Sequence, residues 1–260
     1  AGQFRGWAGF LADAFQEGCD YFNYSRPGAK SSEVLATQLP KALRQNPDIC
    51  AVIVGGNDLL RNNFDPVLLY NNLRSCCQQL LAMGSEIIMV ELHDPNQLLK
   101  LPKLMRQVLS RRVNAVNAVY RKVALEFEIV TVKTRAINNV HDRKNWHIDR
   151  MHPSKYGHQL MATHFREILL RRNWQIDPIA IEETPLTSKK SSIFWMLRNG
   201  TPWFFKRSFD LFPAALILMS VELVKIIFVR KANELGTMYY PEFSPQSQWD
   251  LQEVNEERVS

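Results

Sequence analysis

The sequence predicts an α/β fold, a three-layer αβα sandwich built around a parallel sheet. Apolar runs short enough for strands alternate with amphipathic helical stretches between residues 6 and 172. The run ICAVIVGG is apolar without alternation, as in strands that parallel sheets bury on both faces. Strand–helix–strand connections are almost always right-handed, which favours helices on both faces of the sheet.

Helical spacing of apolar residues and local start and stop signals predict five helices. They are residues 6–17, 31–45, 65–83, 104–127 and 154–172. Gly18 and Gly84 are placed to end the first and third, and Asp65 and Ser154 to begin the third and fifth. Because Pro40 lacks a backbone N–H, we expect a kink in the second helix.

Short apolar runs between these helices predict four strands. They are residues 19–25, 49–56, 86–92 and 128–134. The ends of parallel strands are where α/β proteins form their sites, so polar residues just after residue 54 attract attention.

Composition limits the classes of function. Hydrophobic residues make up 46% and charged residues 22%, which is typical of a globular protein. The net charge is +6, but no zinc-finger spacing or RNA-binding signature accompanies it, so we expect no nucleic-acid partner. The four cysteines show no disulfide framework, which favours a reducing, cytoplasmic location. They are Cys19, Cys50, Cys76 and Cys77.

The chain divides by composition into four parts. They are an α/β domain at 1–172, a linker with an aromatic and basic segment at 173–207, an apolar helix at 208–231 and a polar tail at 232–260.

The apolar helix has three readings. Its core, residues 211–229, approaches the roughly 20 residues that span a bilayer, but Glu222 and Lys225 interrupt it. It could lie on a membrane surface or dock on the α/β domain, cross the membrane once, or form the core of a small second unit. If the helix lies on a membrane surface, that surface is an additional partner of a protein that we expect to be cytoplasmic.

His152 is the first candidate for chemistry. An imidazole is the usual general base near neutral pH, and it needs a partner that fixes its tautomer. Asp149, three residues earlier, can supply that partner, although such pairs are also common on protein surfaces.

The end of the second strand and the loop after the first supply the other candidates. Gly55 leaves room for close backbone approach, and Asn57 could donate a hydrogen bond to a developing oxyanion. Gly28 could donate a second one through its N–H. The plainer readings are that Asn57 or Asp58 caps the next segment and that Gly28 only permits a turn.

Together, these motifs resemble the SGNH hydrolases, the GDSL family of esterases and lipases. The stretches that carry the resemblance are GWAGFLADA, NYSRPGAKSS, GGNDLLR, DRMHPSKYGH and, beyond the domain, SIFWMLRNGTPW. The resemblance implies a flavodoxin-like fold and hydrolysis of carboxylic esters without a cofactor. It assigns general acid–base catalysis to His152, its orientation to Asp149 and the oxyanion hole to Asn57 and the Gly28 N–H.

The family nucleophile is a serine in a Gly-Asp-Ser motif on the first strand, just before the Gly-Trp-Ala helix. No Gly-Asp-Ser and no Gly-x-Ser-x-Gly occurs in the 260 residues. In flavodoxin-like order the first strand is interior, so losing it would leave unpaired edges inside the sheet. We therefore expect that strand and serine upstream of residue 1, and the 260 residues alone to be inactive.

The expected substrate is a small-molecule or lipid-like ester, bound through a seryl ester intermediate. The alternative is a non-catalytic SGNH-like module that binds a ligand or a membrane. No metal is expected, since the histidines and Asp149 lack the spacing of a zinc site. The serines already present do not occupy the family position. They include Ser25, Ser31, Ser32 and Ser154.

Overall fold

The structure is a computed structural model. It describes residues 6–182, apart from 100, 138, 148, 149 and 151, together with Ser220. These residues form two compact units. The first comprises 6–23, 97–99 and 135–182, and the second comprises 24–96 and 101–134. The linker, the apolar helix at 208–231 and the polar tail predicted above lie outside the described residues, apart from Ser220.

The second unit contains a three-stranded parallel sheet. Its strands are β1 (Ile49–Ala51), β2 (Glu86–Val90) and β3 (Thr131–Val132), and they pair in that order. The register aligns Cys50 with Ile87, and Met89 with Thr131. This sheet confirms the predicted α/β class with parallel strands.

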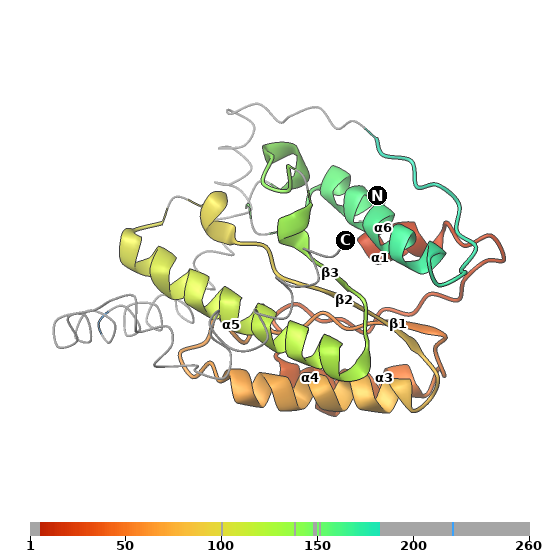
Figure 1. Cartoon of the computed structure of the whole chain (residues 1–260), viewed down its shortest axis with the longest axis horizontal. Helices are drawn as coiled ribbons and strands as arrows, with labels where there is room; N and C mark the ends of the chain where they lie inside the picture. The colour runs from red at the N-terminus through yellow and green to blue at the C-terminus, as the bar shows by residue number, and fades with distance from the viewer. Residues whose placement is uncertain are drawn as a thin grey trace, which may run out of the picture. The chain divides into compact units, whose positions relative to one another are not determined.

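Helices α4 (Pro66–Leu81) and α5 (Lys103–Phe127) pack against each other and, with α3 (Leu39–Leu43), cover one face of this sheet (Figure 1). The Asp65 carboxylate accepts the Val67 and Leu68 N–H groups at 2.8 and 3.2 Å. It thereby caps α4, as the sequence predicts. The apolar sides of α4 and α5 supply most of the core, which explains why both helices were recognisable from their spacing.

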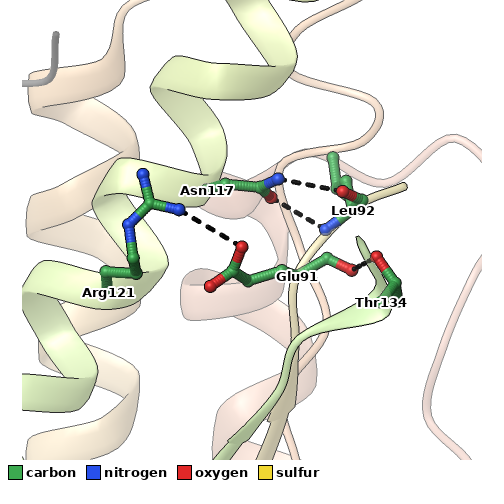
Figure 2. A network of polar contacts seen from close by, with 5 residues as sticks. All are labelled: Glu91, Leu92, Asn117, Arg121 and Thr134. Atoms are coloured by element: carbon green, nitrogen blue, oxygen red, sulfur yellow. Dashed lines mark hydrogen bonds and ion pairs between the residues drawn. The ribbon is translucent and has the colours of Figure 1, made fainter. Parts of the chain in front are cut away.

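A buried polar network joins the end of β2 to α5 and β3 (Figure 2). The Arg121 guanidinium lies 3.2 Å from the Glu91 carboxylate, which is buried. The Thr134 hydroxyl donates to the Glu91 carbonyl at 3.0 Å. The Asn117 amide binds both backbone groups of Leu92, accepting its N–H at 2.8 Å and donating to its carbonyl at 2.9 Å. These contacts fix where the chain leaves the sheet.

Three of the cysteines lie in the second unit as free thiols. Burial raises the pKa of Cys50 to about 11, and burial followed by neighbouring thiols raises those of Cys76 and Cys77 to about 12. The thiolate is the reactive form, so these are inert core residues. Cys19, in contrast, is exposed.

The first unit is built on α1 (Trp7–Ala12) and α6 (Lys155–Leu170), which pack together. The Trp7 ring lies on the Phe165 ring, with centroids 4.4 Å apart. The Ser154 hydroxyl accepts the Gly157 N–H at 3.1 Å and so caps α6, as the sequence predicts.

Helix α1 is shorter than predicted because residues after Ala12 turn to meet the chain beyond α6. Phe15 forms an isolated antiparallel bridge with Ile176, and its ring packs edge-on against Trp174. The Gln16 N–H donates to the Gln175 carbonyl at 3.2 Å. These contacts with a distant segment override the helical spacing of 13–17.

The predicted strand at 19–25 is wrong for the described part of the chain. These residues belong to no ladder, and Tyr21 and Phe22 are 47% and 53% exposed. A strand needs a neighbour for its N–H and C=O groups, and apolar composition alone does not supply one.

The predicted kink at Pro40 takes the form of a change in helix type. Helix α2 (Ser31–Glu33) runs into a π-helical turn, η1 (Val34–Gln38), and then into α3. Because Pro40 has no N–H to donate, the helix widens into a π-helical turn just before it.

The remaining short elements are 3₁₀ turns. They are η2 (Pro95–Gln97), η3 (Thr134–Ala136) and η4 (Arg143–Asn145). Among the residues described, no helix has the length and apolar character to cross a bilayer.

Candidate functional site

The turn after β1 carries Asn57 and Asp58. Gly55 is buried and has a φ of +95°, a left-handed conformation that favours glycine. A Cβ there would lie 3.0 Å from a Val116 methyl and 3.1 Å from a Leu69 methyl. The space that Gly55 leaves is therefore filled by side chains of α4 and α5. Its role in the structure is to let the turn form above the core.

Asn57 binds the loop that contains Gly28. Its side-chain amide donates to the Ala29 carbonyl at 3.0 Å. Gly28 has a φ of +84°, and the Ala29 N–H closes a turn on the Arg26 carbonyl at 3.2 Å. Two loops that are 28 residues apart in the sequence are thus joined beside both predicted oxyanion donors.

Asp58 joins the same two loops a second time. Its carboxylate accepts the Ser31 backbone N–H at 3.1 Å and the Ser31 hydroxyl at 2.6 Å. The Ser31 oxygen in turn accepts from the Asn72 amide at 3.0 Å. Ser31 is 2% exposed, so these hydrogen bonds are shielded from water. Asp58 caps a helix, but the helix is the one that starts at Ser31 and not the next one along the chain.

His152 belongs to the first unit, in the loop that leads into α6. Its carbonyl accepts the His147 N–H at 2.8 Å, and Trp146 pairs with Pro153 in an isolated bridge. The residue is exposed. Asp149, its predicted partner, lies outside the described residues.

Ser154 is occupied by its structural role. Besides capping α6, its hydroxyl donates to the Lys144 carbonyl at 2.5 Å. This confirms the prediction that Ser154 begins the last helix. Asp94 likewise accepts the Asn96 N–H at 3.0 Å and so caps the η2 turn. No group of metal-binding side chains occurs within the described ranges.

His158 is a residue whose importance the sequence did not reveal. Its Nδ1 accepts the Trp7 backbone N–H at 3.2 Å, which links the first turn of α1 to α6. Burial, and then the nearby charge of His152, lower the pKa of His158 to about 4. A neutral imidazole can accept at Nδ1, whereas the imidazolium cannot. His158 therefore holds the two helices together in its neutral form.

This hydrogen bond predicts a pH dependence of stability. The unfolded pKa of histidine is about 6.5, so the folded state binds fewer protons than the unfolded state between pH 6.5 and 4. The contribution of His158 is fully present above pH 6.5 and is lost as the pH falls towards 4. We expect a loss on the order of 2 kcal/mol, discounted for partial exposure.

The matched control is His158→Asn, which keeps an acceptor near the position of Nδ1 but does not titrate. Urea unfolding between pH 7 and 4 measures the difference. The variant should show a flatter dependence of the unfolding free energy on pH than the parent chain. Parallel curves for the two proteins would contradict the assignment to His158.

The predicted site residues thus divide between the two units. Gly28, Asn57 and Asp58 lie together on joined loops of the second unit. His152 lies in the first unit, just before α6, the helix on which His158 accepts the Trp7 N–H.

Comparisons with known proteins place this chain in a family. A model of the GDSL-like lipase/acylhydrolase family matches residues 1–160. The thioesterase 1/protease 1/lysophospholipase L1 proteins of two Escherichia coli strains, K12 and O6:H1, are 29% identical to it over 159 residues. That alignment covers 60% of this chain and 70% of theirs.

A solved structure supports the fold. The acetylxylan esterase of Geobacillus stearothermophilus aligns with a TM-score of 0.50 at 23% identity, over 63% of this chain and 81% of that one. At that level of identity the likeness speaks for the α/β architecture alone. With a match that spans more than half of its length, the chain belongs to the GDSL-like lipase/acylhydrolase family.

Proposed function

We propose that this protein supplies the acid–base and oxyanion parts of an SGNH-type hydrolase of carboxylic esters. The observation that carries the proposal is the hydrogen bond from Asn57 to Ala29, because it holds Asn57 next to the loop of Gly28. A primary amide has two N–H donors, and this bond uses one of them. The bond fixes the orientation of the amide, and in this proposal its second N–H binds the oxyanion.

The proposed reaction proceeds in two steps. A serine oxygen attacks the acyl carbon and passes its proton to His152, while Asn57 and the Gly28 N–H bind the oxyanion. The alcohol then leaves with the proton held by His152. In the second step water attacks the seryl ester, His152 accepts the proton of the water and returns it to the serine. In this proposal, Asp149 orients His152 and stabilises its charge.

The serine itself is proposed to lie upstream of residue 1, on a strand that precedes α1. One feature of the described chain supports an additional strand. Ile53, just after β1, is 39% exposed. Parallel sheets normally bury such residues on both sides.

The substrate is proposed to be a small-molecule or lipid-like ester. The curated relatives are named for thioester and lysophospholipid hydrolysis, and the structural relative for acetylxylan. A test panel should therefore contain an acetyl ester, a long-chain acyl thioester and a lysophospholipid. We also propose a cytoplasmic location and contact with a membrane surface through 208–231; the support is the apolar sequence with basic flanks.

The test compares the 260-residue chain with a form that is extended upstream through a Gly-Asp-Ser loop. We expect the chain alone to hydrolyse no activated ester measurably, since loss of a nucleophile lowers turnover about a millionfold. The extended form should hydrolyse p-nitrophenyl esters. The release of p-nitrophenolate measures both.

Two results would overturn the proposal. Turnover by the 260-residue chain that disappears in His152→Ala would mean that another serine is the nucleophile. A folded extended form without activity on any ester or thioester in the panel would favour the binding-module alternative.

A further inference from the structure

Helix α5 binds the chain on both sides of the Gly55–Asp58 turn. The Tyr120 side chain, which is fully buried, meets the residue before the turn. Its hydroxyl accepts the Val54 N–H at 2.7 Å and donates to the Val54 carbonyl at 2.9 Å. One phenol oxygen thus satisfies both backbone groups of a single residue.

These bonds take the place of ladder bonds between β1 and β2 at Val54. The paired part of β1 ends at Ala51, and the last bond to β2 beyond it is the Val52 N–H to the Ile88 carbonyl, at 2.9 Å. Val54 is buried, so its N–H and carbonyl need partners that water cannot provide. Tyr120 provides them from a helix, where a neighbouring strand would usually do so.

Arg112 holds the other end of the turn. Its guanidinium Nη1 donates to the Leu59 carbonyl at 2.6 Å and to the Arg61 carbonyl at 2.5 Å. The side chain is buried and lies 5.4 Å above the Phe64 ring. An arginine in such a place carries a large desolvation cost, so its position is set by what it binds.

The arrangement recurs at the next strand, which shows what it does locally. Asn117, three residues before Tyr120 on α5, binds both backbone groups of Leu92 where the chain leaves β2 (Figure 2). Residues three apart share a face of a helix. Side chains on one face of α5 thus bind the backbone just beyond two adjacent strands in the same way. The pair of bonds between Asn117 and Leu92 therefore offers an internal control.

We infer that Tyr120 and Arg112 are positioning residues for the oxyanion hole, acting by holding the turn that carries Asn57. This rests on the proposed function, in which Asn57 binds the oxyanion. Only Gly55 and Gly56 separate Val54 from Asn57. Both are glycines with many accessible backbone conformations, so the turn depends on its anchors for a fixed direction.

The first arm of the test uses the 260-residue chain and needs no activity. Hydrogen exchange followed by mass spectrometry should show at least tenfold faster exchange at Val54–Asn57 in Tyr120→Phe, with exchange in α6 unchanged. Asn117→Leu should leave Val54–Asn57 unchanged and act at Leu92. Uniformly faster exchange along the chain, or no local change, would overturn the inference.

The second arm uses the upstream-extended form and a double-mutant cycle. Tyr120→Phe should lower kcat about tenfold or more, with KM changed less than twofold. In the background of Asn57→Ala it should have little further effect, because the donor it positions is gone. Tyr70→Phe, which removes a hydroxyl that donates to Glu126 at an exposed position on α4, is the control.

A structural role alone would lower activity equally in both backgrounds, and that result would overturn the inference. If Tyr120→Phe fails to fold, Arg112→Met asks the same question at the other end of the turn. If the extended form is inactive, the proposed function fails, while the exchange arm still decides whether Tyr120 holds the turn.

Discussion

Gly157→Ala is expected to destabilise the unit that contains His152 by roughly 3 kcal/mol or more. Gly157 lies in the first turn of α6, pressed against the η4 turn. A Cβ at this position would lie 2.0 Å from the Asn145 carbonyl oxygen and 3.2 Å from Pro153 Cβ. The first of these is backbone, so no side-chain rotation can relieve the overlap.

The overlap cannot be relieved by a small movement of the loop either. The same Asn145 carbonyl accepts the Ser154 N–H at 2.9 Å, and Ser154 caps the helix on which Gly157 lies. Moving the carbonyl away would break the contact that begins α6. The loop of His152 lies between these two anchors, so it should be displaced with them.

Thermal or urea unfolding followed by circular dichroism measures the effect. Gly56→Ala is the matched control, because a Cβ at Gly56 meets nothing within 4 Å and its φ is not in the left-handed region. We expect the control to change the unfolding free energy by less than about 1 kcal/mol. Equal effects of the two substitutions would show that close packing at Gly157 is not the cause.

Gly157 also illustrates what the sequence could and could not predict. The helices that bury one side, α4, α5 and α6, were predictable because apolar spacing and local caps agree. A glycine inside HPSKYGH, in contrast, carries no local signal of the carbonyl that it faces. That carbonyl belongs to a turn that precedes it by 12 residues and is visible only once the chain is folded.

The candidate site shows the same division. Asn57 and His152 stood out because one follows a strand and the other precedes a helix, and Gly28 because it lies in a loop, in a pattern that resembles a family. Tyr120 did not, since its spacing on α5 matches that of the apolar residues with which it is buried. His158 did not stand out either, because its bond to Trp7 joins segments 151 residues apart. Periodicity reports which face of a helix is buried but not which backbone groups need a partner there.

Asn57→Ala and His152→Ala should differ in size in the upstream-extended form. Removing one oxyanion donor should lower kcat roughly a hundredfold, because the Gly28 N–H would remain. Removing His152 should lower kcat on the order of a millionfold, since the serine would lose its proton acceptor and the alcohol its proton donor. Steady-state hydrolysis of a p-nitrophenyl ester measures both.

His164→Ala is the control for the larger effect. His164 lies on α6, the helix that follows the loop of His152, but its Nδ1 faces the Glu167 carboxylate at 3.4 Å, and the proposed reaction gives it no role. It should change kcat less than twofold, and imidazole added to the solution should restore part of the activity to His152→Ala but none to Asn57→Ala. Full activity of His152→Ala would refute the proposed general base, because an enzyme that splits esters through a serine needs a group that takes and returns that proton.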